Sequence, residues 1–139
     1  MRFLHSLQNI IKFGGGCKKQ NQKGDVVYCQ GSFDPLLPRH VEFFRKAKKS
    51  GSKLVVGIYS DKMIKRVKGE PFPLLNEYQR FMNLLSMKHV DDVIFRAPYQ
   101  VDKQIIRKLK IKKVVAFEDE DWKVPSSKIY QLPMEMGIL

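Results

Sequence analysis

Short apolar runs alternate with amphipathic stretches along most of this chain. Four runs predict buried strands, at residues 26–29, 54–59, 93–95 and 114–117. Apolar residues at helical spacing lie between them and predict four helices, which begin at Pro38, after Ser60, near Leu75 and near Val101. The resulting order predicts an α/β fold, in which a parallel sheet lies between two layers of helices in a Rossmann-like three-layer arrangement.

The same spacing predicts which side chains these helices bury. In the first helix it places Val41, Phe44 and Ala47 on the inner face. The helix near Leu75 has an apolar stripe made of Leu75, Tyr78, Phe81, Met82 and Leu85. Both helices are therefore expected to cover the sheet through these residues.

The first 24 residues differ from the rest of the chain. Residues 3–12 have the spacing of a short amphipathic helix, and three glycines and a polar basic stretch follow. Residues 1–24 hold five Lys/Arg and no acidic residue, which suits a solvated linker better than a nucleic-acid-binding arm. The sequence thus predicts a basic linker at residues 1–24 and one domain at residues 25–139.

Composition narrows the class of protein. The chain has 139 residues, of which 43% are hydrophobic, enough for one packed domain. The net charge of +12 favours anionic partners such as phosphates, nucleotides, nucleic acid or an acidic membrane, and argues against an acidic ion-sequestering protein. Two cysteines make neither a disulfide framework nor a four-ligand zinc site, and no apolar run reaches the ~20 residues of a membrane span. A cytoplasmic location is expected.

The first predicted strand ends in a segment suited to an anion. Ligands of open parallel sheets bind beyond the carboxyl ends of the strands. Gly31 permits close backbone approach, and the helix that begins at Pro38 offers unpaired N–H groups with a partial positive charge. His40 falls in the first turn of that helix. We therefore expect a phosphate site at this strand–helix junction.

Residues 31–40, GSFDPLLPRH, resemble the G-x-F-D-x-x-H-x-G-H signature of cytidylyltransferases. Further segments resemble that family in order and spacing, namely VGIYSD (56–61), KG (68–69), NEYQR (76–80), KHVDDV (88–93) and APY (97–99). Within the family, the chain is most similar to the second of the two tandem domains of the enzymes that use ethanolamine phosphate. Its linker is similar to the segment that joins those domains.

The resemblance implies a reaction and its partners. Ethanolamine phosphate, or choline phosphate, would attack the α-phosphate of CTP in the presence of Mg²⁺ and form a CDP-amino alcohol for phospholipid synthesis. A partner cytidylyltransferase domain or a homo-oligomer is implied, and peripheral attachment to the endoplasmic reticulum is compatible with that pathway. No specific nucleic acid is expected, because the chain has no aromatic stacking platform for single strands; a basic RNA-binding module ranks a distant third among the hypotheses.

The resemblance also implies roles for individual residues. It assigns phosphate and transition-state contacts to His40 and Lys68, and an amino-alcohol contact to Asp61. The nucleotide contacts that it implies are Gly31, Ser32, Phe33, Asp34, Arg39, Arg80, Asp91 and Tyr99. Each has a structural alternative: His40 and Asp61 as helix caps, Asp34 in a turn, Lys68 as a solvated lysine, Tyr99 in packing, and Arg80 as a buried partner of Asp91.

Three departures from the family pattern predict weak catalysis or none by this chain alone. Leu37 stands in place of the first signature histidine, and Arg39 in place of the intervening glycine. Phe117 and the acidic run at residues 118–121 replace a small loop beside the nucleotide. The R-T-x-G-x-S-T segment is not reached before Leu139. The alternative function is a degenerate repeat that stabilises or regulates a catalytic partner.

Overall fold

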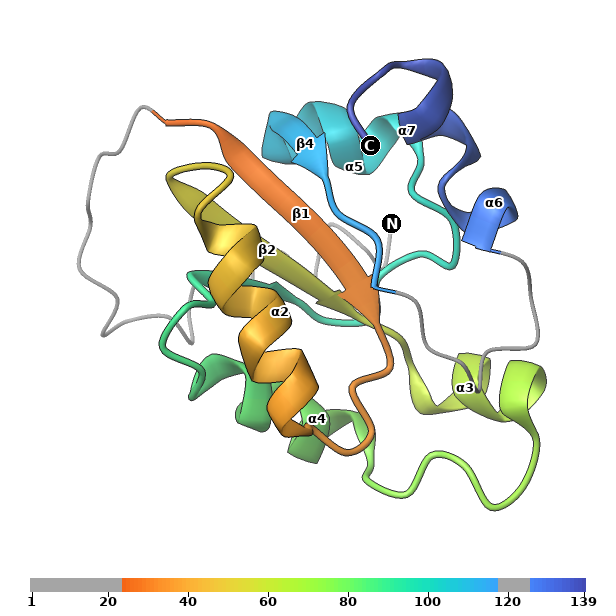
Figure 1. Ribbon diagram of the computed structural model, residues 1–139. Helices are drawn as coiled ribbons and strands as arrows, with labels where there is room; N and C mark the ends of the chain where they lie inside the picture. The colour runs from red at the N-terminus through yellow and green to blue at the C-terminus, as the bar shows by residue number, and fades with distance from the viewer. Residues whose placement is uncertain (1–23, 118–125) are drawn as a thin grey trace.

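The computed structural model describes residues 24–117 and 126–139 and contains one parallel sheet. Its strands are β1 (Val26–Gly31), β2 (Lys53–Ile58), β3 (Asp92–Ile94) and β4 (Ile111–Val114), in the spatial order β3-β2-β1-β4 (Figure 1). All three neighbouring pairs are parallel. The α/β class and the parallel sheet predicted from the alternation are therefore confirmed.

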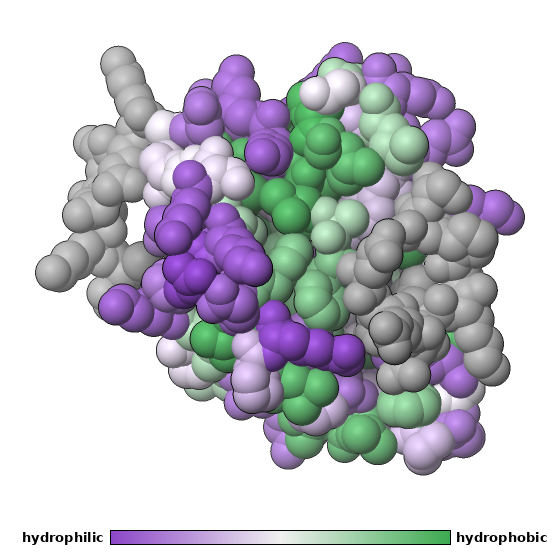
Figure 2. Space-filling model, in the orientation of Figure 1, coloured by the Kyte–Doolittle hydropathy of each residue, from purple (hydrophilic) through white to green (hydrophobic). Residues whose placement is uncertain are grey.

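Six helices connect or follow the strands in the described part of the chain. They are α2 (Pro38–Lys48), α3 (Asp61–Lys68), α4 (Glu77–Leu85), α5 (Lys103–Leu109), α6 (Ser126–Ile129) and α7 (Gln131–Glu135). The last turn of α2 carries Arg45, Lys46 and Lys48, and hydrophilic residues gather over this helix in the space-filling view (Figure 2). No helix among the described residues is long and apolar enough to cross a membrane.

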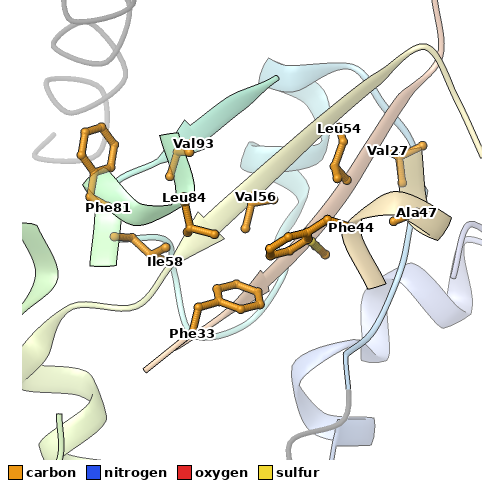
Figure 3. Packing of buried hydrophobic residues seen from close by; sticks show 11 residues of the cluster. Val27, Phe33, Phe44, Ala47, Leu54, Val56, Ile58, Phe81, Leu84 and Val93 are labelled. Atoms are coloured by element: carbon orange, nitrogen blue, oxygen red, sulfur yellow. The ribbon is translucent and has the colours of Figure 1, made fainter. Parts of the chain in front are cut away.

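Two apolar clusters cover opposite faces of the sheet, because successive residues of a strand point to opposite sides. Val27 and Cys29 of β1 belong to the cluster that also contains Phe44 of α2 and Leu84 of α4 (Figure 3). Tyr28 belongs to the second cluster, with residues such as Ile105 of α5 and Ile129 of α6. This division gives the three predicted layers, and Cys29 is fully buried as expected.

Side-chain caps explain where three helices begin. The Ser60 hydroxyl accepts a hydrogen bond from the Met63 N–H, which confirms the predicted cap of α3. Asn76 and Gln79 bond reciprocally to each other's backbone N–H at the start of α4. The Asp102 carboxylate accepts from the Ile105 N–H at the start of α5. Each helix thus starts at a polar residue that satisfies an otherwise unpaired donor.

The predicted inner face of α2 is partly wrong. Phe44 and Ala47 are buried as expected, but Val41 is 43% exposed and His40 is buried in its place. His40, Phe44 and Ala47 are spaced four and three residues apart, so they form one stripe along the helix. The apolar pattern misplaced the stripe because it gave a histidine no weight as a core residue.

The predicted stripe of α4 is also wrong in part. Phe81 is buried as expected, but Tyr78 and Met82 are 65% and 59% exposed, whereas Arg80 and Leu84 are fully buried. A buried arginine rotates the inner face away from the stripe that hydrophobicity alone predicts. The fourth strand also begins at Ile111, three residues before its predicted start at Val114. Val115 still donates to the Tyr28 carbonyl at 2.9 Å, and Phe117 has already left the sheet.

Two sequence-based expectations lie outside the described residues. These are the amphipathic helix at residues 3–12 and the acidic run at residues 118–121. The division into a linker and a domain therefore stays a prediction.

Candidate nucleotide site

The carboxyl ends of all four strands meet at one edge of the sheet. The strand order places β2 and β3 on one side of β1 and β4 on the other. After β1 the chain adds β2 and β3 on one side of the sheet, and it then returns to add β4 on the other side. Strand order therefore reverses between β1 and β4, and ligands of open α/β sheets bind at such a position. The first turn of α2 follows β1 at this edge (Figure 1). The predicted anion site therefore corresponds to a topological switch point of the fold.

His40 lies in the first turn of α2 and is only 4% exposed. Its Nδ1 accepts a hydrogen bond from the Leu37 N–H at 2.8 Å, so a neutral ring carries its proton on Nε2. The ring also stands edge-on to Phe33, with centroids 5.5 Å apart. The capping role considered for His40 is thus present, and a phosphate contact of His40 stays a prediction.

Phe117 packs directly on this histidine. The two ring centroids are 4.7 Å apart, and the Phe117 ring also lies 4.9 Å from that of Phe43. The Arg39 guanidinium carbon lies 5.9 Å from the centre of the Phe117 ring, within range of a cation–π contact. Sequence reasoning identified Phe117 as a departure from the family but did not predict these contacts. They link the loop after β4 to the first turn of α2.

Gly31, the last residue of β1, and the two residues that follow it serve packing and backbone contacts. A Cβ atom on Gly31 would come within 3.1 Å of the Phe33 ring, so a larger residue here would require the ring to shift by a few tenths of an ångström. Phe33 is 3% exposed, has a positive φ of 48°, and lies 5.2 Å from Phe44 between ring centroids. The Ser32 carbonyl accepts from Arg80 at 3.1 Å. These residues lie at the predicted junction, and their contacts as described are with the protein itself.

Arg80 is completely buried and bonds to four protein oxygens. Its Nη1 donates to the carbonyls of Ser32 and Tyr59, at 3.1 and 2.8 Å. Its Nε donates to the Leu75 carbonyl at 3.0 Å, and its Nη2 to Asp61 Oδ1 at 2.8 Å. Arg80 therefore ties together the ends of β1 and β2 and the segment before α4. The expected partnership with Asp91 is wrong, and the ion-pair partner is Asp61.

Glu77 and Arg96 extend this polar cluster and were missed from the sequence. The Arg96 guanidinium donates to both Glu77 oxygens, at 2.6 Å in the shortest bond, and this raises the pKa of Arg96. Glu77 also accepts from the Asp61 N–H at 3.4 Å. Glu77 is 7% exposed in the first turn of α4, a position that favours a carboxylate. We define the Arg80 cluster as Asp61, Glu77, Arg80 and Arg96.

Asp34 and Lys68 lie on either side of the segment that joins α3 to α4. The Asp34 carboxylate accepts from the N–H groups of Leu74 and Leu75, at 2.6 and 2.7 Å. Lys68 is the last residue of α3, and its Nζ lies 5.3 Å from the centre of the Phe72 ring. Asp34 thus holds the end of this segment beside β1. Asp34 lies three residues beyond β1 at the carboxyl edge, whereas Lys68 lies at the end of α3 away from β2.

Asp91 lies at the opposite edge of the sheet from the other predicted residues. It forms an ion pair with Lys48 at the end of α2, and it accepts from the Leu54 N–H at 2.7 Å. Leu54 is the second residue of β2, so Asp91 lies at the amino ends of the strands. The fold does not bring Asp91 to the candidate site. Its nucleotide role, inferred from the resemblance, has no support in this position.

Tyr99 borders a buried polar network that sequence reasoning also missed. The Gln30 amide nitrogen donates to the Tyr99 carbonyl at 2.8 Å and to the Tyr59 hydroxyl at 3.0 Å. Tyr28 donates to the Gln30 side-chain oxygen at 2.8 Å. Burial raises the pKa of Tyr28 and of Tyr59 well above the usual range, so both phenols stay protonated. The network fixes the loop after β3, and Tyr99 takes part through its backbone.

The described residues do not form a site for Mg²⁺ by themselves. No three metal-binding side chains cluster in residues 24–117 and 126–139. The Asp34 carboxylate is bonded to two backbone N–H groups, and Asp61 is paired with Arg80. Magnesium usually binds through one or two carboxylates together with substrate phosphates. The donor set therefore suits an ion that arrives with a triphosphate, rather than one held by the protein.

The sequence matches a known protein family and several curated proteins. The family model described as cytidylyltransferase-like matches residues 28–131. The chain is similar to ethanolamine-phosphate cytidylyltransferases from Dictyostelium discoideum (34% identity), Arabidopsis thaliana (32%) and Mus musculus (30%). These matches cover 98%, 98% and 99% of the chain but 38%, 33% and 34% of the relatives. The chain thus spans about a third of the length of these proteins.

A solved structure supports the fold. The lipopolysaccharide core biosynthesis protein of Thermoplasma volcanium superposes with a TM-score of 0.63 and 21% identity, over 83% of this chain and 90% of that one. At this identity, the likeness concerns the architecture alone.

Proposed function

The chain belongs to the cytidylyltransferase-like family, and on that premise we propose that it is a CTP-binding domain of the ethanolamine-phosphate type. In the proposed reaction, a phosphate oxygen of ethanolamine phosphate forms a bond to the α-phosphorus of CTP. The bond from that phosphorus to the bridging oxygen breaks, and pyrophosphate leaves with the electron pair. Mg²⁺ enters with the triphosphate as part of the substrate. The product, CDP-ethanolamine, would serve phosphatidylethanolamine synthesis.

The observation that carries this proposal is the orientation of His40. Its Nδ1 is held by the Leu37 N–H, so its proton is on Nε2 at the positive end of α2. A donor fixed in this way can stabilise charge on a phosphate without reorganising during the reaction. The net charge of +12 supports the same conclusion, because it attracts a triphosphate.

Catalysis by this chain is proposed to be weak. The Leu37 side chain has no hydrogen-bond donor where the family signature has its first histidine. The loss of one donor to a developing charge typically lowers the rate by about 10²–10³-fold. Arg39 brings a positive charge in place of glycine, but its guanidinium lies over Phe117. We therefore expect binding of Mg–CTP to be easier to detect than turnover.

Calorimetry of the full chain with Mg–CTP tests the proposal. The informative variant is His40→Asn, because the asparagine side-chain oxygen can replace Nδ1 as the acceptor for Leu37 while the Nε2 donor is lost. We expect this variant to weaken binding about tenfold or more, the usual effect of losing a charge-assisted bond. His89→Asn, at a half-buried position before β3, is the matched control and should bind normally. Absence of heat with the wild-type chain at millimolar ligand would contradict the proposal.

Parallel assays with ethanolamine phosphate and choline phosphate address the second substrate. Asp61 is the residue that the resemblance links to the amino alcohol, and its carboxylate already pairs with Arg80. We propose ethanolamine phosphate, since the three relatives that match nearly the whole chain are named for it. Faster formation of CDP-choline than of CDP-ethanolamine would contradict this choice.

A second candidate function is that of a non-catalytic repeat that stabilises or regulates a catalytic partner domain. The contact of Phe117 with His40 favours it, because the predicted donor is covered by a ring. Co-purification with a cytidylyltransferase domain and an increase in that domain's turnover or melting temperature would support this function. Robust turnover by the isolated chain would exclude it.

A further inference from the structure

The first turn of α2 is covered by one aromatic ring from a distant part of the chain. Phe117 follows β4, and its ring lies 4.7 Å from His40 and 4.9 Å from Phe43 between centroids. Its ring also lies 6.4 Å from Phe33, which follows β1. Phe117 therefore bridges the two strands between which the chain direction reverses. In the proposed function, a phosphate would approach His40 from this place.

Electrostatics hold the ring on the same spot. The Arg39 guanidinium carbon is 5.9 Å from the ring centre, and such contacts stabilise a cation against an aromatic face. Arg39 itself is exposed, and its charge is the feature at the start of α2 that would otherwise attract a triphosphate. The Phe117 ring thus contacts two residues at once. It packs on His40 and forms a cation–π contact with Arg39.

We infer that Phe117 competes with the nucleotide for the first turn of α2 and thereby sets the affinity of the chain for Mg–CTP. This inference rests on the proposed function. When only the fraction of molecules with the ring displaced is competent to bind, the apparent dissociation constant rises by the inverse of that fraction. The three contacts of the ring with Arg39, His40 and Phe43 favour the covered arrangement. Removing the ring should therefore tighten binding.

The test compares the wild-type chain with Phe117→Ala, Phe117→Leu and a control. Phe95→Ala is the matched control, because Phe95 is also a half-buried aromatic that follows a strand, but its ring partners are Tyr78 and Phe81. Mg–CTP affinity is measured by calorimetry. The exposure of His40 is measured independently by deuterium exchange at its imidazole C2 position with mass spectrometry, and circular dichroism confirms that each variant folds.

We expect Phe117→Ala to tighten Mg–CTP binding about tenfold and to accelerate exchange at His40, with Phe117→Leu between it and the wild type. Phe95→Ala should change neither quantity. Unchanged exchange at His40 in a folded Phe117→Ala chain would overturn the inference, because the ring would then not cover the histidine. Faster exchange with unimproved affinity would also overturn it.

The outcomes separate this inference from the proposed function. Equal and measurable affinities in the wild type and Phe117→Ala leave the nucleotide site intact and overturn the competition alone. Suppose that exchange at His40 becomes faster in Phe117→Ala but neither chain binds Mg–CTP. The inference and the proposed function are then both overturned, because no nucleotide site exists beneath the ring. Binding by Phe117→Ala alone supports the competition but contradicts CTP binding by the natural chain, and it favours the non-catalytic role.

Discussion

The two halves of the carboxyl edge hold their family-motif residues in opposite ways. In the Arg80 cluster, every guanidinium nitrogen donates to a protein oxygen, and the arginine is fully buried. Around the first turn of α2, His40 lies among aromatic rings, with Arg39 over one of them. We call the Arg80 cluster the polar half of the edge. We call the first turn of α2, with the aromatic rings that pack on His40, the aromatic half.

This difference shows at which motif positions a substitution can be tolerated without loss of the fold. Arg80 connects the ends of two strands to the segment before α4, so its replacement would leave several buried carbonyls without donors. Leu37 and Arg39 are exposed at the start of α2, so their replacement affects few internal contacts. Arg80, which matches the family motif, holds the structure together, whereas Leu37 and Arg39, which depart from it, lie at the start of α2 beside the proposed phosphate site.

The largest expected effect comes from breaking the polar half. Arg80→Met should lower the free energy of unfolding by about 4 kcal/mol, because it leaves Asp61 and the Ser32, Tyr59 and Leu75 carbonyls without their donor. Urea denaturation followed by circular dichroism measures this change. Arg96→Met is the control, since the Arg96 side chain is 53% exposed, and it should have a much smaller effect. Equal losses in the two variants would refute the central role of Arg80.

The second largest effect is expected in the aromatic half, where two substitutions restore the family signature. The double variant Leu37→His/Arg39→Gly should raise CDP-ethanolamine formation by about 10²-fold, since it restores one donor to the phosphate site and removes the cation that holds Phe117. A coupled pyrophosphate assay on the full chain measures the rate. The same double change in a chain that also carries His40→Asn should give little gain. A rate that stays at background in the double variant would count for the non-catalytic role.

A smaller effect is expected where the two halves meet. Asp34→Ala should lower the free energy of unfolding by about 2 kcal/mol, because the Leu74 and Leu75 N–H groups lose a charged acceptor. Asp34→Asn keeps one acceptor oxygen and should lose about half as much. Thermal denaturation and hydrogen exchange of the segment before α4 measure both. Fast exchange in Asp34→Ala without faster exchange in α2 would show that the two halves move independently.

The smallest effect is the pH dependence of stability, which tests whether water is excluded from the core beneath the aromatic half. Cys29 lies in the same cluster as Phe33 and Phe44, and burial raises the pKa of its thiol above the ordinary value of 9.0. Because the thiol ionises only in the unfolded chain, its contribution to stability is complete below pH 9.0 and is lost as the pH rises further.

Denaturation at several alkaline pH values measures this loss. The buried tyrosines Tyr28, Tyr59 and Tyr130, whose pKa values are also raised, act in the same direction. The free energy of unfolding should fall by up to about 1.4 kcal/mol per pH unit for Cys29, and Cys29→Ala should make the fall less steep. An identical slope in Cys29→Ala would mean that water reaches the thiol in the folded chain.

The comparison of sequence and structure has a physical lesson for the candidate site. The spacing of the apolar runs predicted the sheet and its order along the chain, since the core requires those residues whatever the details. It failed at His40 and Arg80, because both are polar residues in buried positions whose partners come from other elements. Gln30, Glu77 and Arg96 were missed for the same reason. A buried charge is predictable only together with the groups that neutralise it.

The sequence by itself determined the alternation of strands and helices and the cap at Ser60, because these depend on neighbours along the chain. The anion site at the Gly31 junction stays a prediction. Only the tertiary structure decided that Asp61 rather than Asp91 pairs with Arg80, and that Phe117 lies on His40. Such contacts join residues that are 19 or more positions apart, so they depend on how the sheet orders its strands. The strand order decides which motif residues come together at the carboxyl edge and which lie elsewhere, as Asp91 does.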